Sequence, residues 1–137
     1  MRKTGAAVAA VLLSIGLAGA AHAGPAAALH GPQDPEPSEG VLLTVSGSSD
    51  TWIRGVRLQC SPEPGGPHPH AAEACAELER AQGDPGALTG EPALCSRRFD
   101  PVTASAKGTY MGKSVAWRKT FANACELSAA TGHVFRF

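Results

Sequence analysis

The segment 93–101 carries the residue types whose order could do chemistry. Arg97 and Arg98 stand two and three positions after Cys95, in a stretch bounded by two prolines. The simpler interpretation is a solvated basic turn held by a disulfide. The alternative is a bait for a trypsin-like protease, whose specificity pocket ends in an aspartate that pairs naturally with a guanidinium. A disulfide next to the scissile bond would remove conformational freedom in advance, so such a segment would bind tightly and be hydrolysed slowly.

Other residues give little support for catalysis. The chain has none of the short motifs of hydrolases, phosphate loops or dinucleotide sites. His68 and His70 could chelate a metal together with a third ligand, although a role in a Pro-rich loop or as caps is simpler. Asp100 and His133 could join a serine in a triad, but no local pattern marks a nucleophile. We therefore expect no enzyme, no cofactor and no metal site.

Four cysteines, an even number, supply the covalent ties that a small domain needs: Cys60, Cys75, Cys95 and Cys125. In an exported chain two bridges are the expected state of four such residues. No pair has C-x-x-C spacing, which argues against a zinc knuckle or a thioredoxin-type redox site. Three pairings are possible, and spacing alone does not choose among them.

The N-terminal region predicts export of a single domain. Residues 1–23 combine a basic start, a short apolar run and the small-x-small end of a signal peptide, and the run is too short for a membrane helix. Residues 24–40 are rich in Ala, Pro, Glu and Gly and predict a flexible leader, followed by the domain 41–137. Without the signal segment the formal charge is −2. This speaks against a nucleic-acid or anionic-membrane partner bound through a basic surface.

The elements that must position these residues follow from periodicity. Apolar residues at helical spacing predict one amphipathic helix over 71–78, with Cys75 on its inward face. Runs of alternating or apolar residues predict several strands. A helical turn around 122–125 is too short to define. Few helices and no β-α-β alternation indicate an α+β fold with an antiparallel sheet. The predicted strands cover 41–45, 56–60, 102–110, 113–121 and 133–137.

Short motifs recur in order along the whole expected domain. They are Val41-Leu42-Leu43-Thr44-Val45, Leu58-x-Cys60, His68-Pro69, Ala74-Cys75-Ala76-Glu77-Leu78, Gly83-Asp84, Ala87-Leu88-Thr89, Cys95, Phe99-Asp100-Pro101-Val102, Gly108, Gly112-Lys113, Phe121-x-Asn123-x-Cys125-Glu126 and Val134-Phe135-x-Phe137. Together with the cysteine intervals, this series resembles the Streptomyces subtilisin inhibitor family, a family of secreted serine protease inhibitors.

The resemblance implies a fold and an assembly. It implies a five-stranded antiparallel sheet with two α-helices, the disulfides Cys60–Cys75 and Cys95–Cys125, and secretion. It also implies a two-fold homodimer formed through the sheet. The implied partners are extracellular serine proteases of the subtilisin-like and, with a basic primary residue, the trypsin-like kind.

The resemblance also assigns site residues. Arg97 matches the primary specificity residue and Arg98 the residue on the leaving side of the scissile bond, with Cys95, Ser96 and Phe99 as flanks. Asn123 matches the asparagine that supports the loop from behind.

Two residues depart from the usual family pattern. Ser96 stands where many members have proline, so a fixed φ is lost. Arg98 replaces a small or apolar residue.

Three alternatives stay open at this point. Arg98 could be the primary residue. The two arginines could together recruit a dibasic-specific processing protease. The chain could also be a secreted interaction or wall-associated protein that keeps the scaffold without inhibition.

Overall fold

The computed structural model describes residues 39–137, so the predicted signal segment and most of the predicted leader lie outside the described residues. The first strand already begins at Gly40, the last residue assigned to the leader. Within residues 39–137 the longest helix has ten residues, and none is long and apolar enough to cross a membrane.

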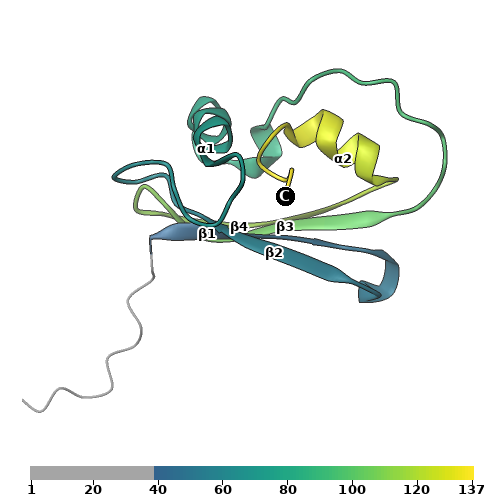
Figure 1. The fold of residues 1–137 in the computed structure, drawn as a ribbon, viewed down its shortest axis with the longest axis horizontal. Coiled ribbons are helices and arrows are strands. Elements are labelled where there is room, and N and C mark those ends of the chain that lie inside the picture. The colour runs from purple at the N-terminus through teal and green to yellow at the C-terminus, as the bar shows by residue number, and fades with distance from the viewer. Residues whose placement is uncertain (1–38) are drawn as a thin grey trace, which may run out of the picture. The chain divides into compact units, whose positions relative to one another are not determined.

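Four antiparallel strands form one sheet in the order β2-β1-β3-β4 (Figure 1). The hairpin β3–β4 turns at Met111 and Gly112, both with positive φ, as the predicted break between the two strands requires. A single 3₁₀ turn, Ser48–Asp50, joins β1 to β2. The strands are β1 (Gly40–Ser46), β2 (Ile53–Leu58), β3 (Val102–Tyr110) and β4 (Lys113–Phe121).

Both helices, α1 (Ala71–Arg80) and α2 (Ala124–Thr131), lie on the same face of the sheet (Figure 1). Along β1 the residues Val41, Leu43 and Val45 are buried on this inner face, whereas Leu42 on the outer face is 42% exposed. Period-two alternation therefore assigns one face of the sheet to the core and the other to solvent.

Helix α1 confirms the predicted amphipathic stripe, and it extends to Arg80. Ala74, Cys75 and Leu78 are its buried residues. Cys75 is bonded to Cys60, just after β2, with an S–S distance of 2.03 Å. This bridge fixes α1 over the edge of the sheet near β2.

The predicted last strand is wrong, so the described residues form four strands and not five. Gly132, with φ of +60°, ends α2 and turns the chain inward. The neighbours Val134 and Phe135 are then both buried, which an alternating strand with one core face does not allow. The short helical turn expected at 122–125 is instead the start of the eight-residue helix α2.

Candidate functional site

The loop formed by residues 91–100 has no regular structure and stands out from the domain. In Figure 1 it arches around α2 before entering β3. Leu94 is fully exposed and Phe99 is 79% exposed, although both side chains are apolar. Arg97 and Arg98 are also exposed. Such a loop offers its side chains to a partner and contributes little to the core.

The two ends of this loop are fixed on the chain around α2. At the upstream end the Gly90 N–H donates to the carbonyl of Ala130 at 3.2 Å, and at the downstream end the Asp100 N–H donates to the carbonyl of Ala122 at 2.9 Å. Gly90 lies so close to α2 that an added Cβ would meet the carbonyl oxygen of Ala129 at 2.2 Å. Only glycine permits this approach.

A disulfide holds the middle of the loop to the same helix. Cys95 is bonded to Cys125, in the first turn of α2, with a Cα–Cα distance of 5.6 Å. All four cysteines are thus paired as the family resemblance implies, since Cys60 is bonded to Cys75. Arg97 lies only two residues from a covalent anchor.

Asn123 supports the loop from behind with both ends of its side-chain amide. Its Nδ2 donates to the carbonyls of Ser96 at 3.2 Å and Arg98 at 3.0 Å. Its Oδ1 accepts from the Glu126 N–H at 3.0 Å, so the same residue is the N-cap of α2. The Asn123 side chain is only 8% exposed, and its orientation is therefore set by the fold.

This pattern treats the peptide groups around Arg97 differently. The carbonyls before and after that of Arg97 are held by Asn123, whereas no hydrogen bond within residues 39–137 reaches the Arg97 carbonyl. Within the same residues neither Arg97 nor Arg98 forms an ion pair. The Arg97 carbonyl and the two guanidinium groups are available to a binding partner.

The contact with Ser96 bears on the missing proline. A proline there would fix φ but would leave its carbonyl to be held by other groups. Here the Ser96 carbonyl is tied to a buried amide, and the preceding residue is tied by a disulfide. Two restraints act on the backbone at this position in spite of the departure from the family pattern.

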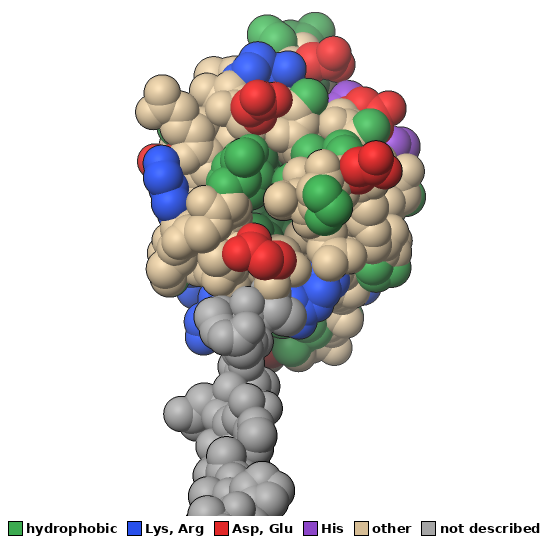
Figure 2. Space-filling view, turned by 90° about the vertical axis from the view of Figure 1, so that its left-hand side faces the viewer, with side chains coloured by type: hydrophobic (Ala, Val, Ile, Leu, Met, Phe, Trp, Pro, Cys, Tyr) green, Lys and Arg blue, Asp and Glu red, His purple; other side chains and the backbone are tan. Residues whose placement is uncertain are grey.

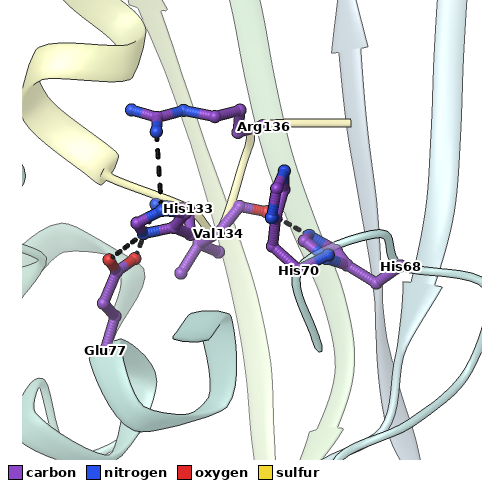
Figure 3. A network of polar contacts seen from close by, with 6 residues as sticks. All are labelled: His68, His70, Glu77, His133, Val134 and Arg136. Atoms are coloured by element: carbon purple, nitrogen blue, oxygen red, sulfur yellow. Dashed lines mark hydrogen bonds and ion pairs between the residues drawn. The ribbon is translucent and has the colours of Figure 1, made fainter. Parts of the chain in front are cut away.

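A second group of polar residues lies beyond the other end of α2 and ties the C-terminal tail to α1 (Figure 3). His68, 5% exposed, donates from Nε2 to the Val134 carbonyl at 3.0 Å, and its Nδ1 accepts from the His70 N–H at 3.0 Å. Both nitrogens are used only by the neutral ring. Burial lowers the pKa of His68 below its ordinary value, more than the Val134 carbonyl raises it.

His133 is held in the same group by Glu77 of α1. One carboxylate oxygen accepts from the His133 N–H at 2.7 Å and the other lies 2.8 Å from Nδ1 (Figure 3). His133 is therefore committed to Glu77 and not to Asp100, whose backbone anchors the exposed loop. Among the described residues no group of three or more metal-ligating side chains is present.

Some features of the site were missed by sequence reasoning. The eight-residue helix α2 had a signal, because Asn123 and Glu126 have the N-cap and N3 spacing of a capping box. The anchoring of Gly90 and Asp100 had none, since both bonds join backbone groups far apart in sequence.

The comparisons with known proteins agree on one family. The family model described as subtilisin inhibitor-like matches residues 36–123. A subtilase-type protease inhibitor of Streptomyces coelicolor is 40% identical over 126 residues, covering 88% of this chain and 85% of the relative. A subtilisin inhibitor of Streptomyces albogriseolus is 42% identical over 105 residues, covering 74% of this chain and 73% of the relative.

A solved structure shares the fold. It is Streptomyces caespitosus sermetstatin in complex with Bacillus licheniformis subtilisin, with a TM-score of 0.60 and 33% sequence identity over 72% of this chain and 97% of that one. The chain therefore belongs to the subtilisin inhibitor-like family, whose members are protease inhibitors and not enzymes.

Proposed function

We propose that the chain is a secreted, substrate-like inhibitor of serine proteases, with Arg97 as the primary specificity residue and Arg97–Arg98 as the scissile bond. The observation that carries the proposal is the Asn123 amide, which holds the carbonyls on both sides of Arg97 while the Arg97 side chain stays exposed. The family membership supports protease inhibition in general. The basic primary residue and its trypsin-like target are the specific part of the proposal.

In the proposed complex, residues 96–98 lie extended in the protease cleft and form main-chain hydrogen bonds with it. The Arg97 guanidinium enters a pocket with a carboxylate at its base. Interfaces of this kind bury about 1,600 Å² in total. Most of the binding energy would come from Arg97 and its immediate neighbours, since a few central residues dominate such interfaces.

Slow hydrolysis follows from what happens after attack. The protease serine would add to the Arg97 carbonyl carbon, and the C–N bond to Arg98 would break as the Arg98 nitrogen takes up a proton. In a free peptide the new amine would diffuse away. Here the Arg98 carbonyl stays bonded to Asn123, so the amine remains in place and the reverse reaction competes with water.

The test is a titration of trypsin and subtilisin with the protein and three single variants. Arg97→Ala should abolish trypsin inhibition, Arg97→Lys should retain most of it, and Arg98→Ala should keep it. The thermal transition of each variant serves as the control for folding. Unchanged trypsin inhibition by Arg97→Ala would show that the primary residue has been misplaced.

N-terminal sequencing of slowly cleaved inhibitor separates the first two alternatives from the main proposal. A new terminus at Arg98 means that Arg97 is primary, whereas a new terminus at Phe99 means that Arg98 is. If neither protease is inhibited stoichiometrically, the scaffold serves as a secreted or wall-associated interaction protein. The homodimer through the sheet stays a prediction, and the outer face on which it depends is considered next.

A further inference from the structure

Charges are separated between the two layers of the domain. The four strands contain six Lys and Arg residues and no Asp or Glu, although the mature chain as a whole has more acidic than basic residues. In Figure 2 Lys and Arg side chains stand at the lower end of the view, below a set of Asp and Glu side chains. The basic residues of the strands are Arg54, Arg57, Lys107, Lys113, Arg118 and Lys119.

Three of these residues lie on the outer face of the sheet, and strand register brings them together. Leu42 of β1 is paired with Arg57 of β2 on one side and with Lys107 of β3 on the other. One row further along, Thr44 is paired with Ser105, which is paired in turn with Arg118 of β4. We name Arg57, Leu42, Lys107, Thr44, Ser105 and Arg118 the basic face.

The basic face is poorly suited to a second copy of itself. Leu42 is its single large apolar side chain, while the Thr44 and Ser105 hydroxyls already bond each other at 2.6 Å. Homodimer interfaces are more apolar than this and have few charges at their centre. A two-fold contact would also bring six like charges together, which costs binding energy unless anions intervene.

The chain itself carries a complementary segment, residues 34–39, directly before β1. It reads Asp-Pro-Glu-Pro-Ser-Glu, and no Lys or Arg occurs between residues 24 and 53. We propose that the acidic segment 34–39 docks in cis on the basic face, with its carboxylates opposite Arg57, Lys107 and Arg118.

Reach and concentration favour this occupant over an external one. Six extended residues span about 20 Å. The Leu42 and Thr44 rows begin only two and four residues beyond Gly40, about 7 and 13 Å along the strand. Because the segment is covalently joined to β1, its effective concentration at the face is in the millimolar range. Two prolines also restrict its backbone in advance, which lowers the ordering cost.

The test compares amide spectra of the secreted chain with those of two triple variants of equal charge. Asp34→Asn/Glu36→Gln/Glu39→Gln neutralises the segment, and Glu63→Gln/Glu79→Gln/Glu91→Gln is the matched control. We expect the first variant to shift the amide resonances of Leu42, Thr44, Lys107 and Arg118 at low salt. The control should leave them in place, and 0.5 M NaCl should move the parent toward the first variant because it screens the attraction.

A reciprocal variant and a mass measurement complete the experiment. Lys107→Gln/Arg118→Gln should make the amides of residues 34–39 more mobile in relaxation measurements. The proposal is overturned if the leader variant and the control give the same spectrum, or if sedimentation shows a low-salt dimer whose contact covers the basic face. Neither readout depends on protease inhibition, so the two proposals fail independently.

Discussion

Two irregular segments of this domain are each held by one buried polar side chain, and the comparison shows what such a contact is used for. Asn123 bonds two carbonyls of the loop 91–100, and His68 bonds the carbonyl of Val134 in the C-terminal tail. In the loop the apolar side chains Leu94 and Phe99 face solvent, whereas in the tail Val134 and Phe135 are buried.

The difference lies in what else fixes the segment. The tail is held by its own burial, so His68 mainly satisfies polar groups that the core would otherwise leave unpaired. The loop buries almost nothing, and its shape depends on a disulfide, the Asn123 amide and the backbone bonds at its two ends. Removing a single restraint should therefore change the loop in its function and the tail in its stability.

The largest effect is expected from Cys95→Ser/Cys125→Ser. Without this bridge the loop loses its covalent anchor, and we expect it to be cut by trypsin like an ordinary substrate. Closing a 30-residue loop is worth about 4 kcal/mol of stability on the chain-entropy model. The measurements are the rate of loop cleavage and the free energy of unfolding.

The other disulfide provides the matched control. Cys60→Ser/Cys75→Ser opens a 15-residue loop, worth about 3 kcal/mol on the same model, without touching the exposed loop. Under conditions where this variant is folded, its inhibition constant should equal that of the parent. Equal loss of inhibition in both variants would mean that general stability, and not local anchoring, keeps the loop intact.

The next effect comes from Asn123→Asp. The carboxylate still accepts from the Glu126 N–H and caps α2, but it cannot donate to the carbonyls of Ser96 and Arg98. Loss of two hydrogen bonds of about 1 kcal/mol each predicts inhibition constants that rise roughly ten- to a hundredfold.

The variant Asn123→Ala completes this experiment, because it removes the helix cap as well. It should weaken inhibition to a similar degree and lower the free energy of unfolding by about 1 kcal/mol more than the aspartate does. If Asn123→Asp inhibits as well as the parent, the amide does not shape the loop.

A smaller effect is expected from pH at the tail. The unfolded chain binds a proton on His68 near pH 6.5, but the folded chain binds it only at lower pH, since burial lowers the pKa. Stability is therefore complete above about pH 6.5 and falls as the pH drops through the window below it, by at most about 1.4 kcal/mol per pH unit.

Denaturant unfolding between pH 4.5 and 8 measures this slope. His70, Glu73 and Glu77 contribute smaller charge effects at His68. His68→Gln keeps a donor for the Val134 carbonyl and removes the titrating ring, so its stability should depend less on pH than that of the parent. An identical slope in both proteins would assign the pH dependence to other groups.

The smallest effect is expected at Glu77. Glu77→Ala removes both acceptors for His133 and should cost about 1–2 kcal/mol of unfolding free energy, without changing inhibition. Glu77→Gln keeps one acceptor for the His133 N–H and should cost less than half as much. A change in the inhibition constant of either variant would show that the tail and the loop are coupled.

The sequence predicted what local patterns determine. The stripe of Ala74, Cys75 and Leu78 located α1, and alternating residues located the four observed strands to within a few positions. The exposed loop was located by its two prolines, the cysteine and the paired arginines, because these residues are neighbours in the chain.

The sequence could not predict contacts made by backbone groups far apart in the chain. The segment 133–137 has a composition typical of a strand, but it fills a space under the helices that only the assembled fold defines. In the same way, the residues Gly90 and Asp100 carry no mark of their attachment near α2. Net charge also concealed the basic face, because acidic residues in the other layer compensate for it.

Helix α2 has one further consequence, for the engineering of this domain. The loop's two attachment points, Ala122 and Ala130, are eight residues apart across this helix, about 12 Å at the rise of an α-helix. The helix thus works as a ruler that sets the chord of the loop. New sequences can be grafted between positions 91 and 99 as a cassette, whereas adding or deleting one residue in α2 would rotate one attachment point by about 100° and ruin the frame for every graft.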